Sequence, residues 1–254
     1  MTTTTLLVIL GNLLFVIACG AIGGHLVLLA RRTGHAPERL LGSGLLLLVL
    51  SIPLLGASGM GRVTVGEVKL PLVIAGLALL SMSVLCQSAF VWRTFRPGRS
   101  WALMLTVSLG IAEFVVSGWI LHAILNSAPE LPASAATREG IFFIRIPLTI
   151  SYAWTSIEGF MQYRMARRRQ KLGIGDAVLT NRFFVWSSTG ALAFSNTVVS
   201  SALHLHGMTP FNHPLSAALL GVGSTLSSIG LLLVFLPPAR YLDWIKARSA
   251  ATAA

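Results

Sequence analysis

Charged side chains are scarce in this sequence, and acidic ones most of all. Of its 254 residues, 11% are charged and only 8 are Asp or Glu, whereas about 25% of the residues of a soluble domain are charged. Hydrophobic residues make up 54% of the chain, and the mean hydropathy is +0.78. Too little polar surface is left to cover a soluble core, which excludes an ordinary soluble domain and indicates that lipid is the solvent.

Cysteine and the familiar catalytic motifs are also nearly absent. The two cysteines, Cys19 and Cys86, lie in separate apolar runs, which excludes a disulfide framework and a thiol-rich metal site. The sequence contains no HExxH, GxSxG, Walker or H-x-E zinc motif. We therefore favour a protein without enzymatic activity, although the sequence alone leaves this point open.

Long apolar runs are what the chain does contain. A transmembrane helix needs about 17 to 25 apolar residues, and backbone groups in lipid must be hydrogen-bonded within the segment. The sequence predicts an all-α polytopic membrane protein with a bundle of seven transmembrane helices. The predicted spans are 5–30, 40–58, 70–92, 101–126, 141–163, 183–205 and 214–236.

The basic residues are distributed unevenly between the two ends of these spans. Cytoplasmic loops carry the excess of Lys and Arg, and 15 of the 19 basic residues follow spans 1, 3, 5 and 7. This predicts an outside N-terminus, a cytoplasmic C-terminus and a multi-pass protein of the plasma (inner) membrane. The same asymmetry explains the basic segment "MARRRQK" without any binding of nucleic acid. It leaves open that the basic face binds an anionic lipid or a cytoplasmic partner. The 15 are Arg31, Arg32, Arg39, Arg93, Arg96, Arg99, Arg164, Arg167, Arg168, Arg169, Lys171, Arg182, Arg240, Lys246 and Arg248.

The chain divides into a transmembrane domain, 1–236, and a tail, 237–254. In "LPPARYLDWIKARSA" two prolines end the last span, and Tyr241, Leu242, Trp244 and Ile245 share one helical face. This pattern predicts a short amphipathic helix at the cytoplasmic membrane surface. The whole layout resembles that of microbial rhodopsins and seven-helix receptors. A retinal pigment is excluded, because the span 214–236 has no lysine to form a Schiff base.

Polar residues at membrane depth are the candidate functional groups, since charges there are costly and normally face the bundle interior. The most unusual is Glu113, midway along the fourth span. Ser117 shares its helical face, and counting from the span ends puts Tyr152, Ser156 and Asn196 at a similar depth. We interpret Glu113 as either a carboxyl that carries protons or binds a ligand, or one that braces neighbouring helices.

A second polar layer lies near the outer surface. It contains Arg145, which could hold an anionic ligand or Glu113, or extend to the interface. It also contains four of the six histidines: His122, His204, His206 and His213. Histidine ligates metal and haem, so a metal or haem site is an alternative, although the spacing matches no recognised motif.

A third layer lies about six residues from the cytoplasmic ends and contains His25, Gln87 and Glu158. Glu158 belongs to a polar row along the fifth span and could pair with Arg164 or Arg167.

Three hypotheses about function follow from the three polar layers. The first is a transporter, an ion or proton pathway, or a ligand receptor; the second is a haem or metal redox protein; the third is an assembly subunit that docks a cytoplasmic partner.

Overall fold

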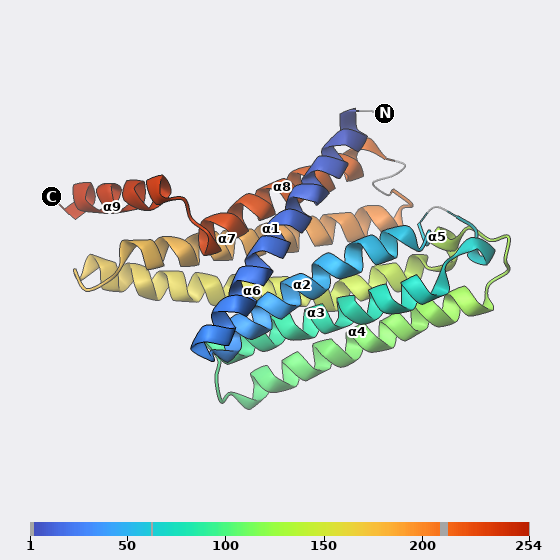
Figure 1. The fold of residues 1–254 in the computed structure, drawn as a ribbon, viewed down its shortest axis with the longest axis horizontal. Helices are drawn as coiled ribbons and strands as arrows, with labels where there is room; N and C mark the ends of the chain where they lie inside the picture. The colour runs from blue at the N-terminus through green and yellow to red at the C-terminus, as the bar shows by residue number, and fades with distance from the viewer. Residues whose placement is uncertain (1–2, 62, 209–212, 254) are drawn as a thin grey trace.

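In the computed structural model, which describes residues 3–61, 63–208 and 213–253, the chain is all-α. The long helices run roughly side by side (Figure 1). Arg62 and residues 209–212 lie outside the described residues. Within the described part the helices are α1 (Thr3–Thr33), α2 (Ala36–Ala57), α3 (Leu70–Phe95), α4 (Ser100–Asn126), α5 (Ala133–Ala136), α6 (Arg138–Lys171), α7 (Ala177–Leu205), α8 (Pro214–Phe235) and α9 (Ala239–Ala253), with one 3-10 turn, η1 (Val65–Glu67).

The turns that follow α1 and α6 end these helices sharply. Gly34 and Gly173, at φ +74° and +73°, adopt a left-handed conformation that other residues rarely take. Asp176 caps α7 by accepting a hydrogen bond from the Val178 backbone N–H at 2.8 Å. Pro237 and Pro238 separate α8 from α9, as the sequence predicted.

Six of the described helices, α1, α2, α3, α4, α6 and α8, are long and apolar enough to cross a membrane. The prediction of spans is confirmed for these six. The seventh predicted span is a helix, α7, but ten of its 29 residues are Ser, Thr or Asn. This polar composition keeps α7 below the apolarity of the other six, so the seven-span count is not established by the helices alone.

The bundle buries polar side chains together with apolar ones and exposes large apolar side chains on its outer faces. Buried side chains include many serines as well as Glu113 and Glu158, whereas Met104, Val115 and Leu125 of α4 are each at least 65% exposed. Such apolar outer faces need a lipid environment, while small and polar residues pack between membrane helices. The protein is therefore a multi-span integral membrane protein.

Six helices form a closed ring. Contacts join α1 to α2, α2 to α3, α3 to α6, α6 to α7, α7 to α8 and α8 back to α1. Helix α4 is outside this six-helix ring, packed on α3 and α6. Figure 1 shows the α6–α7 hairpin extending beyond the ends of α1–α4, with α9 beside it.

Helix α9 packs against α7. The Asn181 amide donates to the Tyr241 hydroxyl at 2.6 Å, and the Gln170 amide donates to Ser249 at 3.1 Å. Ile245 is buried and Trp244 is 53% exposed. The predicted helix exists, therefore, and one of its faces is occupied by the hairpin.

Candidate functional site

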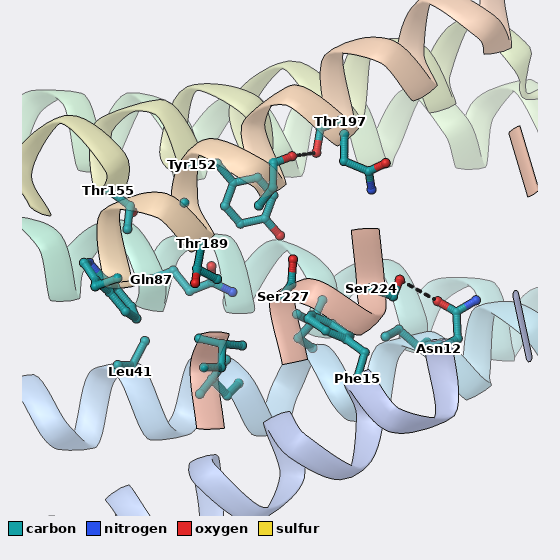
Figure 2. A pocket seen from close by; sticks show the side chains of 18 of the residues that line it. Asn12, Phe15, Leu41, Gln87, Tyr152, Thr155, Thr189, Thr197, Ser224 and Ser227 are labelled. Carbon is teal, nitrogen blue, oxygen red and sulfur yellow. Dashed lines mark hydrogen bonds between the residues drawn. The ribbon is translucent and has the colours of Figure 1, made fainter. Parts of the chain in front are cut away.

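Side chains from all six helices of the ring line a cavity of about 370 Å³. We call it the central cavity. Figure 2 shows Gln87, Tyr152, Thr189 and Ser227 directed toward this common space from four different helices. Its polar side chains are Asn12, Gln87, Tyr152, Thr155, Thr189, Asn196, Thr197, Ser224 and Ser227, and its apolar ones include Phe15, Leu45, Leu48, Phe90, Trp186 and Leu231.

The lining carries no Asp, Glu, Lys, Arg or His among the residues that the structure describes. Several polar side chains are already occupied: Ser224 donates to the side-chain oxygen of Asn12, Oδ1, at 3.2 Å, and the Gln87 side-chain amide donates to the Ser83 hydroxyl at 3.1 Å. Thr197 donates to the Ala193 carbonyl within its own helix, a bond drawn in Figure 2. The cavity is therefore neutral.

Three lining groups keep free hydrogen-bonding capacity. Within the described part of the chain, neither the Tyr152 hydroxyl nor the Asn196 amide has a hydrogen-bond partner in the protein, and the buried Trp186 Nε1 also lacks one. The absence of a side chain at Gly223 makes room for Asn196, because a Cβ there would lie 2.9 Å from the amide carbon. Trp186 is held edge-on by Phe90 and Phe235, with ring centroids 5.8 and 5.5 Å away.

Glu113 lies outside the central cavity. Its side chain is fully buried, and both carboxyl oxygens lack a hydrogen-bond partner among the described residues. Since α4 packs on α3 and α6, the carboxyl is enclosed where these three helices meet. Tyr152, which lines the cavity, belongs to α6, so the helix that carries Glu113 packs against a helix of the cavity wall.

Buried hydroxyls surround this junction on both sides. Ser81 and Ser117 are 3.0 Å apart, and Ser88 and Ser151 are 3.3 Å apart. We call the residues Ser81, Ser88, Thr106, Glu113, Ser117 and Ser151 the α3–α4–α6 seam; all six are buried. The serines are satisfied by one another and by backbone carbonyls, which leaves Glu113 as the unsatisfied member.

Glu158 has a structural partner that sequence reasoning did not identify. Arg96 Nε donates to Glu158 Oε1 at 2.7 Å, and Trp154 Nε1 donates to the same oxygen at 3.2 Å. The partner is therefore Arg96, at the end of α3, rather than Arg164 or Arg167. The signal was "FRPGRSW", a basic turn that joins α3 to α4 at the depth of Glu158.

The remaining predicted site residues are dispersed. Arg145 donates to the Ser200 carbonyl oxygen at 2.9 Å, and Ser156 donates to the Ser187 carbonyl oxygen at 2.9 Å, so each joins α6 to α7. His25 is exposed on the outer surface of α1. Of the nine predicted pathway residues, the central cavity contains Gln87, Tyr152 and Asn196.

The outer histidines have separate surroundings. His122 and His206 are exposed, whereas His204 is buried with Nε2 3.3 Å from the Arg138 carbonyl oxygen. His213 Nδ1 is buried without a partner among the described residues. No group of three or more His, Cys, Asp or Glu side chains suited to a metal ion occurs in the described part of the chain.

Sequence reasoning missed Asn12, Trp186 and Thr189 as lining residues. Asn12 could have been found, because an asparagine in the middle of "LVILGNLLFVI" is as unusual as Glu113.

Comparison with protein-family models, with characterised proteins and with solved structures gives no match. The function must therefore be argued from the geometry of the site.

Proposed function

We propose that the protein binds a neutral small molecule in the central cavity, as a membrane transporter or a seven-helix receptor. One observation carries the proposal: a cavity of about 370 Å³, lined by six helices, has hydrogen-bonding groups but no charged lining residue in the described part. Ligand sites commonly measure about 300 to 1,000 Å³ and combine apolar walls with a few polar groups.

The lining indicates the chemical class of the ligand. Phe15, Phe90 and Trp186 favour a ring or branched apolar body, since aromatic side chains make large apolar contacts. Tyr152 and Asn196 can each donate and accept, and Trp186 Nε1 can only donate. A neutral molecule with at least one hydroxyl or carbonyl group satisfies this set, whereas an ion would lose its hydration without gaining a counter-charge.

The seven-span topology forms part of the proposal. Helix α7 contributes Trp186, Thr189, Gly190, Ala193, Asn196 and Thr197 to the cavity, so its polar residues have a use inside a membrane-spanning ring. With α7 as the seventh span, the N-terminus is outside and the C-terminus cytoplasmic, in the plasma membrane. Helix α9 then lies at the cytoplasmic surface with Trp244 available to headgroups.

The test uses three probes of one shape and different charge: 2-naphthylmethanol, 2-naphthoate and 2-naphthylmethylammonium. Binding to the detergent-purified protein is measured by equilibrium dialysis. Ala193→Trp fills the cavity, and Ala191→Trp, on an exposed position of the same helix, is the matched control for partition into detergent. We expect the alcohol alone to bind the wild type and Ala191→Trp, but not Ala193→Trp. Equal binding to both variants would refute the site.

A second candidate function is proton movement through the α3–α4–α6 seam. It is favoured by Glu113, whose buried carboxyl oxygens have no partner among the described residues, because an intramembrane carboxyl of this kind is characteristic of proton pathways. In liposomes carrying an entrapped pH-sensitive dye and a potassium diffusion potential, the wild type should change the internal pH. Glu113→Gln should not, and a matching response in both would exclude this function.

A further inference from the structure

One face of α6 changes from apolar to basic where the helix leaves the bundle. Residues at three-, four- and seven-residue spacings lie on one side of a helix. Ile146, Ile150, Ile157 and Phe160 on this side are all exposed, at 40 to 58%. Four exposed cations continue the same face, and we call them the basic stripe: Arg164, Arg167, Arg168 and Lys171.

The basic stripe borders a hollow of about 350 Å³. It is lined by the four cations together with Phe160 and Tyr163. Within the described residues none of the four cations forms an ion pair, since the salt bridges found there join His35 to Glu38 and Arg96 to Glu158. The Tyr163 ring is held between Phe160 and Phe184, at centroid distances of 6.1 and 5.3 Å. Its hydroxyl has no hydrogen-bond partner in the same part of the chain and can donate to a ligand.

The depth of the stripe matches the headgroup layer. Glu158 is level with Arg96, at the end of α3, and Arg164 and Arg167 follow about 9 and 14 Å further along α6. Helical side chains lean toward the helix N-terminus. Because the N-terminus of α6 is at the opposite end of the bundle, Arg164 and Arg167 lean back toward the apolar part of the stripe.

We infer that the basic stripe binds the phosphate of an anionic phospholipid, whose acyl chain lies along Ile157 and Phe160. Guanidinium groups bind phosphate in a bidentate manner, and the Tyr163 hydroxyl supplies a further donor. A lipid is the fitting occupant because the apolar face and the cations are continuous on one helix. This inference is independent of the proposed ligand in the central cavity.

The test measures which lipid the purified full-length protein retains. Protein in mild detergent is incubated with equimolar phosphatidylglycerol and phosphatidylcholine, and bound lipid is quantified by native mass spectrometry. We expect the wild type to retain phosphatidylglycerol at least 5-fold over phosphatidylcholine. Arg164→Gln, Arg167→Gln and Arg168→Gln combined should remove most of that preference, and Tyr163→Phe should reduce it.

The control variant also loses three positive charges at the same end of the bundle: Arg31→Gln, Arg32→Gln and Arg169→Gln combined. All three are exposed and lie outside the hollow. We expect this variant to keep the wild-type preference. Equal loss in both triple variants, or no preference in the wild type, would overturn the inference. We expect phosphatidylglycerol to stay bound in excess inorganic phosphate, which would identify the lipid as the ligand. Displacement of the lipid by inorganic phosphate would overturn the inference and indicate a site for the soluble ion.

Discussion

At the scale of single residues, the two buried carboxyls have opposite roles. Glu158 accepts from Arg96 and Trp154, whereas neither oxygen of Glu113 has a partner among the described residues. A paired carboxylate contributes to stability through its partner, and its removal leaves that partner uncompensated. The two acids are therefore expected to respond differently to the same isosteric substitution.

Glu158→Gln should destabilise the protein by about 1 to 2 kcal/mol. This is less than the usual cost of breaking a fully buried ion pair, because Arg96 is 35% exposed and solvent screens the interaction. Glu113→Gln should change stability by less than about 1 kcal/mol, since no hydrogen bond is lost. Thermal unfolding in detergent measures both. Arg96→Gln should cost about as much as Glu158→Gln, and the double variant little more than either single one; additive losses would exclude a pairwise interaction.

Tyr152 and Asn196 should determine affinity in the central cavity, because their polar groups are available to a ligand. Tyr152→Phe and Asn196→Leu should each weaken binding of 2-naphthylmethanol about 3- to 10-fold, the usual effect of one lost hydrogen bond. Ser195→Ala, at an exposed position beside Asn196, serves as the control in the same dialysis assay. A loss with Ser195→Ala as large as with Asn196→Leu would mean that the effect is not local.

At the scale of helices, α1 is held at two close crossings. A Cβ at Gly11 would collide with the backbone oxygen of Gly221 in α8, and a Cβ at Gly23 would lie 3.0 Å from the Gly42 oxygen in α2. Asn12 and Phe15, which line the cavity, lie between these two points. The crossings therefore fix the wall that α1 contributes to the site.

Gly11→Ala should lower the unfolding temperature in detergent, because the α1–α8 crossing must open to admit the methyl group. Gly24→Ala is the matched control, since nothing lies within 4 Å of the added Cβ and alanine favours the helix by about 1 kcal/mol. We expect it to be neutral or stabilising. If both substitutions lowered the unfolding temperature equally, the crossing would not be a close contact.

The elements that could be predicted from sequence were those whose signal is local. Apolar runs located the six helices long enough to span a membrane, and the proline pair located one helix boundary. Sequence patterns gave no answer where it depended on which helices pack together. Depth counting placed Glu113 near Tyr152, but only packing puts Tyr152 in the ring and Glu113 outside it. Likewise, nothing local indicates that Glu158 pairs with Arg96, which is 62 positions away.

At the scale of the whole molecule, the account depends on α7 crossing the membrane. Seven spans place the two ends of the chain on opposite sides of the membrane, whereas six would place them on the same side. The test uses single cysteines in a Cys19→Ala and Cys86→Ala background, at Ser127 and Ile174 in the loops after α4 and α6, and at Ala247, an exposed position of α9.

An impermeant maleimide should label Ser127→Cys in intact cells, and Ile174→Cys and Ala247→Cys only after permeabilisation. Ser127→Cys and Ile174→Cys report the two sides of the membrane whether the chain has six spans or seven, because both lie before α7 in the chain. Labelling of Ala247→Cys in intact cells would contradict the seven-span topology.

Above all, we propose that the six-helix ring lines a site for a neutral small molecule. The most direct measurement is mass spectrometry of the compounds that co-purify with the wild type, Ala191→Trp and Ala193→Trp, extracted from equal amounts of folded protein. The account predicts a neutral compound with a hydroxyl or carbonyl group in the wild type and Ala191→Trp, and its loss from Ala193→Trp. The same compounds in all three preparations, or a charged one lost from Ala193→Trp alone, would contradict it.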